Sequence, residues 1–466
     1  MVFSSASFLF LFLPVFIATY FLAPTTRAKN LITLLFSLIF YGWGEPWFVL
    51  VLLGSISFNT VAALFIDQRQ GLPRTISLAS AIALNLLLLA VFKYAGFFVE
   101  NIDVVLRQFG LALPVPQIGL PLGVSFFTFH CLSYLIDVYR GRFAANRDPV
   151  EVALYVSLFP QLVAGPIVRY KTVARQLRCR RHSLGRASVG LRIFILGLTQ
   201  KVLIADQLSQ IVEAVFDRTP LPSMTESWIG LLGYTLQIYF DFAGYSNMAI
   251  GLGLVLGFTL PRNFRLPYTA QSITEFWRRW HISLSSWLRD YLYIPLGGSR
   301  SGALRTYRNL ATVFLLCGLW HGASWTFVLW GIWHGTFLII ERLGLARLLL
   351  FVHPLGRWAY MLLVVMGSWV LFRATSLPAA GKMYRGLVGV HNLGGIGFEL
   401  HSALNPGVLL ALFAGCIFAV SPRLPRLTTT WDSYEVVRHA WSFCLLVLAM
   451  IYIAAGVYSP FLYFKF

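Results

Sequence analysis

The sequence predicts an all-α protein that crosses a membrane many times. Its 466 residues are 58% hydrophobic and only 12% charged, whereas a soluble domain is usually about 45–50% apolar and about 25% charged. Apolar blocks recur along the whole chain, and many approach the roughly 17–25 residues that a spanning helix needs. We therefore expect a polytopic protein with about ten to twelve membrane helices, re-entrant segments included.

We expect one membrane-embedded domain over residues 1–466, with N-terminal helices (1–150), a core that carries the polar motifs (151–340) and C-terminal helices (341–466). The first block, "MVFSSASFLFLFLPVF", has no basic residues before its apolar run, which favours a membrane segment over a cleaved signal peptide. The apolar blocks lie at roughly 7–23, 31–43, 46–66, 76–99, 118–138, 151–168, 188–205, 228–260, 310–340, 358–372, 407–421 and 440–459.

Basic residues between the blocks give the chain its net charge of +19 and are densest over residues 169–192 and 262–308. Such clusters are typical of cytoplasmic loops and attract anionic lipid headgroups. Because the chain has no soluble basic domain, its composition argues against nucleic-acid binding. With Arg69 and Arg140 in cytoplasmic loops, the first blocks alternate consistently across the membrane.

The block 151–168 breaks this alternation, because basic loops flank it on both sides. It also contains Pro160 and Gly165, which interrupt a helix. A re-entrant segment that enters and leaves from the cytoplasmic side resolves the conflict. Non-helical backbone at membrane depth is tolerated only inside protein or beside a wet cavity, so this block predicts an internal chamber.

The block 228–260 contains "YFDFAGYSN", which places Asp241 and Asn247 at membrane depth. A bare carboxylate there would be costly, so Asp241 either pairs with a nearby basic residue or takes part in binding.

The stretch 272–298, "SITEFWRRWHISLSSWLRDYLYIPLGG", predicts an amphipathic helix at the membrane interface. Ser272 and Glu275 have the spacing of a capping box at its start. Trp280, Trp287 and Tyr291 would share one face of that helix. This interpretation does not explain why His281 lies in the same stretch.

Two histidines, His321 and His334, lie inside the apolar block 310–340, each within a Trp-His-Gly tripeptide. In one continuous helix their thirteen-residue separation would place them ~20 Å apart and on different faces. They could then serve one reacting centre only if the helix breaks between them. A buried neutral imidazole can act as a general base, although a hydrogen-bonded packing role is equally open. No His-x-x-x-His spacing or acidic partner favours a metal site.

Several motifs together resemble the membrane-bound O-acyltransferase superfamily, and within it the bacterial alginate O-acetylase group. The matching stretches are "MVFSS", "GPIVRY", "YFDFAGYSNMAIGLG", "PRNFRLPY", "SITEFWRRWHISLSSWLRDYLYIPLGG", "GLWHGASWTFVLWGIWHG" and the ending "FLYFKF". The chain departs from the group's pattern at Ala243 and Asn247, where the group more often has serine and a second acid. Asp241 is therefore the stronger candidate within that motif.

The resemblance implies a many-helix fold around a central tunnel, with His321 as the catalytic histidine. It implies supporting polar roles for His281 and Asp241, while His334 is common in the group but less clearly catalytic. Side chains of the same motifs are candidate tunnel or substrate contacts. These are Trp280, Arg278, Arg289, Asp290, Trp320 and Asn263.

The function implied by the resemblance is acetyl transfer across the bacterial inner membrane for O-acetylation of an exported polysaccharide, most simply alginate. The implied donor is acetyl-CoA from the cytoplasm, with no tightly bound cofactor and no metal. A separate periplasmic acetyltransferase with a Ser-His-Asp site is the implied partner, together with polysaccharide export machinery. The alternatives are the same chemistry on cellulose or peptidoglycan, and a polytopic transporter or flippase without acyl chemistry.

Overall fold

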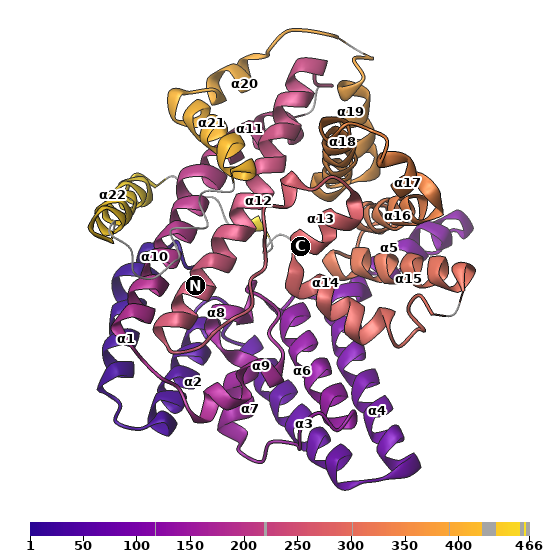
Figure 1. Cartoon of the computed structure of the whole chain (residues 1–466). Coiled ribbons are helices and arrows are strands. Elements are labelled where there is room, and N and C mark those ends of the chain that lie inside the picture. Colours follow the sequence, from indigo (N-terminus) through magenta and orange to yellow (C-terminus); the bar gives the residue numbers. More distant parts are fainter. Residues whose placement is uncertain are drawn as a thin grey trace. The chain divides into compact units, whose positions relative to one another are not determined.

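Every regular element in the described part of the chain is a helix, which confirms the predicted all-α class (Figure 1). The computed structural model describes residues 1–116, 118–218, 221–300, 302–390, 392–421, 435–456 and 461–462.

The chain divides into two compact units, which are described separately below. Unit 1 comprises residues 1–190 and 249–261, and unit 2 comprises residues 191–248 and 262–466. The prediction of a single domain with boundaries at 150 and 340 stays a prediction.

Among its described residues, unit 1 contains nine α-helices, the beginning of a tenth and the last turns of α12 (Met224–Val255). The first ten of these are α1 (Leu13–Leu22), α2 (Thr26–Gly42), α3 (Phe48–Gln68), α4 (Gly71–Leu89), α5 (Ala95–Leu106), α6 (Val124–Tyr139), α7 (Pro149–Ser157), α8 (Phe159–Leu162), α9 (Tyr170–Arg178) and the start of α10 (Leu184–Thr199). π-Helical turns at Ser7–Phe12 and Ala90–Tyr94 continue directly into α1 and α5.

Unit 2 contains the remaining helices. They are α11 (Asp206–Phe216), α12 (Met224–Val255), α13 (Ile273–Arg279), α14 (Ile282–Leu288), α15 (Ala303–His321), α16 (Trp325–Ile340), α17 (Ala346–Leu349), α18 (Pro354–Arg373), α19 (Leu377–Leu387), α20 (Phe398–Ala403), α21 (Pro406–Val420) and α22 (Glu435–Ala454). The end of α10 belongs to this unit, whereas the last turns of α12 belong to unit 1.

Five helical stretches among the described residues are long and apolar enough to cross a membrane. They are Phe48–Gln68, Gly71–Phe109, Leu184–Phe216, Pro354–Arg373 and Val437–Ala454. Three shorter apolar stretches, Ser7–Leu22, Val124–Tyr139 and Pro406–Val420, add to them. The chain is therefore a multi-pass membrane protein, while the count of ten to twelve segments and the central tunnel stay predictions.

The block 151–168 is interrupted, as its Pro and Gly residues predict. Helix α7 ends at Ser157, α8 is a single turn, and the chain after Val163 is not helical until α9. Phe159 of α8 is fully buried among aromatic rings of the N-terminal helices, including those of Phe12 and Phe16 at 5.5 and 5.2 Å. This irregular backbone is thus enclosed by protein.

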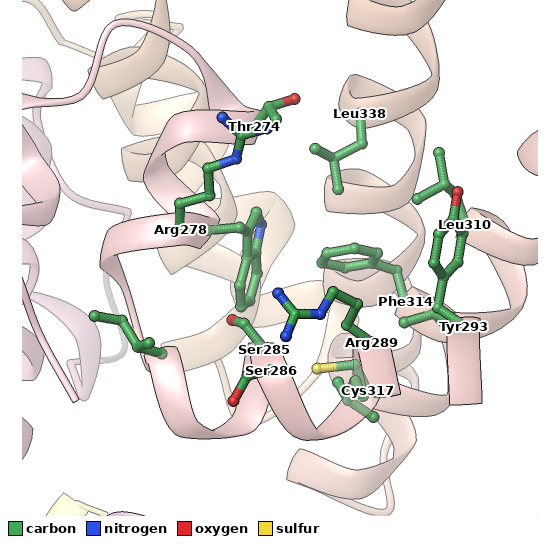
Figure 2. A pocket seen from close by; sticks show the side chains of 14 residues that line it. Thr274, Arg278, Ser285, Ser286, Arg289, Tyr293, Leu310, Phe314, Cys317 and Leu338 are labelled. Atoms are coloured by element: carbon green, nitrogen blue, oxygen red, sulfur yellow. The ribbon is translucent and has the colours of Figure 1, made fainter. Parts of the chain in front are cut away.

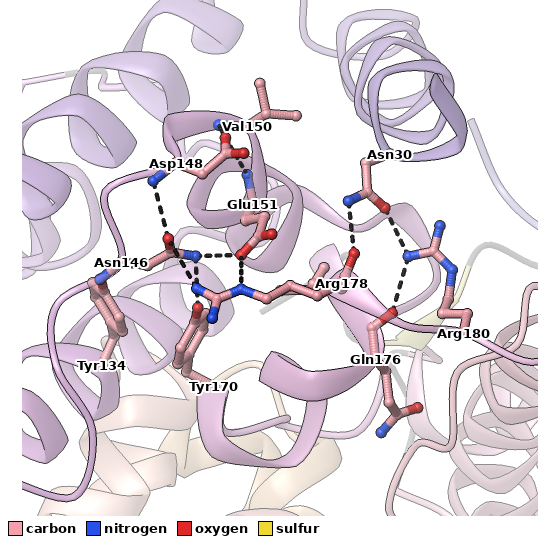
Figure 3. Close-up of polar contacts among 11 residues, drawn as sticks. Asn30, Tyr134, Asn146, Asp148, Val150, Glu151, Tyr170, Gln176, Arg178 and Arg180 are labelled. Atoms are coloured by element: carbon pink, nitrogen blue, oxygen red, sulfur yellow. Dashed lines mark hydrogen bonds and ion pairs between the residues drawn. The ribbon is translucent and has the colours of Figure 1, made fainter. Parts of the chain in front are cut away.

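A polar network holds this block to the basic segment that follows it (Figure 3). Glu151 of α7 accepts hydrogen bonds from Asn146 Nδ2 at 2.6 Å and from Arg178 Nε at 3.1 Å. Asn146 Nδ2 also donates to the hydroxyl of Tyr170 at 2.7 Å, and Arg180 Nη1 donates to Asn30 Oδ1 at 2.7 Å. Part of the basic cluster at 169–192 therefore serves internal packing in addition to its predicted topological role.

Candidate active site

The predicted interfacial helix over 272–298 is wrong in its geometry, because the structure breaks it in two. Helix α13 ends at Arg279, and α14 begins at Ile282 after His281 adopts left-handed backbone angles, with φ of 43°. Trp280 and Trp287, expected on one amphipathic face, are only 3% and 6% exposed. A left-handed conformation is uncommon for a residue other than glycine and often marks a functional position.

The start of α13 agrees with the predicted cap. Ser272 Oγ accepts a hydrogen bond from the backbone N–H of Glu275 at 3.0 Å. The Glu275 carboxylate accepts the backbone N–H of Gln271 at 2.8 Å, one residue before the position that a capping box would use.

Asn263 fixes the position of His281. The Oδ1 atom of Asn263 accepts the backbone N–H and the hydroxyl of Ser283 at 3.2 and 2.9 Å, so this atom is the amide oxygen. His281 Nδ1 lies 3.1 Å from the same oxygen and must therefore carry a hydrogen. In the neutral ring, Nε2 then carries the lone pair.

The block 310–340 forms two helices and not one. The helix therefore breaks between His321 and His334, as is required if both histidines are to serve one centre. Helix α15 ends at His321, and α16 starts at Trp325 after a turn at Gly322. The two helices pack closely against each other, because Gly318 and Gly331 face one another where they touch. A Cβ on Gly331 would lie 2.3 Å from the carbonyl oxygen of Phe314, and one on Gly322 would lie 2.1 Å from the Phe327 ring.

We expect Gly331→Ala to lower the free energy of unfolding by about 1–3 kcal/mol, the usual cost of forcing an extra methyl group into a tight contact. The clash is with backbone, which cannot rotate away. Gly381→Ala on α19 is the matched control, since a Cβ there meets nothing within 4 Å. The thermal unfolding midpoints of the two purified variants check this. Equal midpoints would show that the α15–α16 contact is looser than the structure has it.

Trp330 of α16 connects the two histidines. Its ring centroid lies 4.9 Å from that of His321 and 4.9 Å from that of His334. Trp320 and Phe372 complete the aromatic surroundings of His321, with centroids at 4.7 and 5.1 Å. His321 itself is 6% exposed, so its imidazole lies in a largely apolar environment.

His334 makes hydrogen bonds with both ring nitrogens. Trp277 Nε1 is a donor only and gives its hydrogen to His334 Nδ1 at 3.3 Å. His334 Nε2 therefore carries the hydrogen and donates to Ser368 Oγ at 3.0 Å, while that hydroxyl donates to the carbonyl of Val365 at 2.7 Å. Because the lone pair on Nδ1 is occupied, this geometry favours a positioning role for His334.

The rings of Trp320, Trp330 and Phe372 form an aromatic cluster around His321. His281 lies on another side of this cluster. Its ring centroid is 6.3 Å from that of Trp320, which in turn contacts His321. Phe242 of α12 packs edge-on against His281 at 4.6 Å. The structure thus brings His281, Trp320, His321 and His334 into one aromatic cluster.

Asp241 is paired with a buried cation, one of the two possibilities left open by the sequence. Lys201 Nζ lies 2.7 Å from Asp241 Oδ1 and 2.6 Å from Asp206 Oδ1, and all three side chains are at most 4% exposed. Close contact between α10 and α12 makes this possible, since a Cβ on Gly244 would lie only 2.7 Å from the Gly197 carbonyl oxygen. Asp241 Oδ2 also accepts the backbone N–H of Leu462, within the ending "FLYFKF", of which residues 461–462 are described.

A pocket of about 420 Å³ lies beside the cluster and contains two of the predicted contact residues (Figure 2). Arg278 and Arg289 line it, and Arg289 Nε donates to Asp290 Oδ1 at 2.7 Å. Trp277, the donor to His334, forms part of its wall. The described lining does not include His321, His281 or Asp241.

Four side chains that the sequence does not single out as candidates belong to the site: Trp277, Trp330, Ser368 and Lys201. The two tryptophans lie within the quoted motifs, but nothing in their spacing shows that they contact histidines. Ser368 lies in an apolar helix with no distinguishing signal. Lys201 had one signal, because it is a basic residue within the apolar block 188–205.

Comparison with known proteins identifies one family. A family model described as MBOAT, membrane-bound O-acyltransferase family, matches residues 35–377. The chain is 41% identical to a probable alginate O-acetylase of Pseudomonas putida over the full length of both chains, and 46% identical to one of Azotobacter vinelandii over 82% of this chain and 77% of that relative. A peptidoglycan O-acetyltransferase of Helicobacter pylori is 35% identical over 100% of this chain and 98% of the relative. The family match covers every residue of the aromatic cluster.

Proposed function

Because the chain belongs to the membrane-bound O-acyltransferase family, we propose that it transfers acetyl groups from a cytoplasmic donor across the bacterial inner membrane for O-acetylation of an exported polysaccharide. The chain is an acyltransferase and a multi-pass membrane protein. The observation that carries the proposal is the placement of His321 at the break between α15 and α16, inside an aromatic cluster and close to a second buried histidine.

Alginate is the proposed polysaccharide, on the strength of the likeness to probable alginate O-acetylases, over the full length in one and over 82% of this chain in another. Peptidoglycan is the second candidate, because the Helicobacter pylori relative also matches the whole chain. Cellulose has no such support among these relatives. Acetate released by mild alkali from each isolated polymer, in cells with and without the gene, distinguishes the candidates.

In the proposed chemistry, His321 accepts the proton of an acceptor hydroxyl, and the oxygen attacks the carbonyl carbon of an acetyl thioester. The carbon–sulfur bond breaks, and the departing thiolate takes the proton from the imidazolium. A neutral imidazole in an apolar surrounding is suited to this cycle, since it begins and ends without charge. His281, with its lone pair on Nε2, is proposed to orient the reacting groups from the other side of Trp320.

Acetyl-CoA is the proposed donor, and the pocket of Figure 2 is the proposed place for its polar part. Arg278 is exposed and makes no ion pair within the described chain, so its guanidinium is available for a phosphate. Asp290 partly neutralises Arg289, which leaves Arg278 as the stronger anion-binding group. From this pocket, the acetyl end would reach His321 past Trp277 and Trp330.

The proposed partner is a separate periplasmic acetyltransferase with a Ser-His-Asp site, which would deliver the acetyl group to sugar hydroxyls. The likeness to alginate O-acetylases supports a place within polysaccharide modification machinery.

The proposal predicts that purified chain in proteoliposomes consumes acetyl-CoA and releases free CoA when an acceptor is supplied. Release of CoA is measured with a thiol reagent, and Arg278→Gln is expected to raise the donor KM without a similar change in kcat. Movement of a solute across the vesicle without CoA release would contradict the proposal, because that result would indicate a transporter.

A further inference from the structure

We propose that unit 1 binds an anionic phospholipid in a groove between α3 and α4, with one acyl chain along the groove and the headgroup phosphate at Arg69. The groove has a volume of about 390 Å³. Both helices belong to the stretches long and apolar enough to cross a membrane. The larger apolar side chains along the groove are 37–55% exposed, so they present an open apolar surface; they are Phe58, Val61, Phe65, Ile76 and Leu84.

The length of the groove matches one leaflet of a bilayer. At one end Asn59 and Asn85 exchange hydrogen bonds at 3.1 and 2.8 Å, which fixes α3 against α4. At the other end lies Arg69, ten residues beyond Asn59. At 1.5 Å per residue this span is about 15 Å. That is about half of the ~30 Å hydrocarbon core of a membrane.

The polar end of the groove provides a cation and two hydroxyls. Arg69, Ser77 and Ser80 all line it. The Arg69 guanidinium lies 5.1 Å from the ring centre of Phe65, and its Nη1 contacts Ser77 Oγ at 3.5 Å. It makes no ion pair with any described residue, and the carboxylate of Asp67, two residues away, instead accepts the backbone N–H of Ala145. Arg69 is therefore available to a phosphate.

The apolar length of the groove and the Arg69 cation at its end together favour a phospholipid over other anions. A free phosphate would use only the polar end and leave the apolar length empty, whereas a lipid without a phosphate would leave Arg69 without an anion. In a zwitterionic phospholipid the choline cation would compete with Arg69 for the phosphate, so an anionic headgroup fits best. Basic pockets between membrane helices commonly bind anionic headgroups. The residues that line the groove come from α3, α4 and the turn that joins them, and none of them lines the pocket of Figure 2.

Native mass spectrometry of the purified full chain tests the proposal, with phosphatidylglycerol, phosphatidylcholine and inorganic phosphate as probes. We expect the wild-type chain to retain a phosphatidylglycerol molecule in preference to phosphatidylcholine. Arg69→Gln should weaken this binding about fivefold, the effect of one interfacial cation. Ala62→Trp, which adds an indole to the groove lining, should abolish it.

Two matched variants serve as controls. Arg27→Gln removes another exposed cation of unit 1, and Ala83→Trp adds an indole at an exposed position of α4 outside the groove. Both should bind phosphatidylglycerol as the wild type does, and all four variants should unfold at similar temperatures without lipid. Any one of three results would overturn the proposal. These are phosphatidylglycerol binding by the Ala62→Trp variant, equal binding of phosphatidylcholine and phosphatidylglycerol by the wild type, and displacement of phosphatidylglycerol by millimolar inorganic phosphate.

Discussion

Replacing His321 by alanine is expected to reduce O-acetylation of the exported polysaccharide by a factor of about 10²–10⁴, the usual contribution of a general base. That loss corresponds to roughly 3–5 kcal/mol of transition-state stabilisation. His321 is buried beside Trp320, Trp330 and Phe372, where the proposed base is surrounded by aromatic rings. Polymer acetate per unit of membrane-inserted protein is the quantity to measure.

His401→Ala is the matched control for this experiment, since His401 lies exposed on α20 and its loss should leave acetylation unchanged. His334→Ala is the informative comparison. Because His334 is held between Trp277 and Ser368, its loss is expected to reduce stability together with activity. Near-normal acetylation by the His321→Ala variant would rule out His321 as the base.

Lys201→Met is expected to have the largest effect on stability, about 3–5 kcal/mol, because it leaves buried carboxylates without their cation. Lys201 lies between Asp206 and Asp241 at 2.6 and 2.7 Å, and all three side chains are almost completely buried. The loss should appear as a lower unfolding midpoint in detergent and as a smaller amount of protein in the membrane.

Two further variants separate charge from packing in this experiment. Lys171→Met removes an exposed lysine of α9 and should change stability by less than about 0.5 kcal/mol. The triple variant Lys201→Met, Asp206→Asn, Asp241→Asn removes all three charges, and we expect it to recover much of the lost stability. A Lys201→Met protein as stable as the wild type would mean that the ion pairs contribute little.

The sequence predicts correctly those features that depend on composition or local pattern. The apolar blocks predict an all-α membrane protein, and Pro160 and Gly165 predict the interruption after α7. The cost of a bare carboxylate in a membrane limits Asp241 to two roles, and its contact with Lys201 shows one of them. Similarly, Ser272 caps α13 at the predicted position.

The features that the sequence does not predict depend on tertiary contacts. The helix break at His281 requires a left-handed non-glycine residue, for which no local pattern exists, and the bonds to Asn263 hold it there. The close packing of α15 against α16 depends on glycines whose small size matters only where the two helices touch. The distinct protonation patterns of His281 and His334 follow from partners 18 and 57 residues away along the chain, Asn263 and Trp277.

The most direct test of the account is the rate of acetyl transfer by purified wild-type and His321→Ala chains in proteoliposomes, measured together with their affinity for acetyl-CoA. We predict that transfer falls at least about 100-fold in the variant, as expected for a lost general base, while donor affinity stays within a factor of about two. Transfer at the wild-type rate, or a loss explained entirely by weaker donor binding, would contradict the central claim.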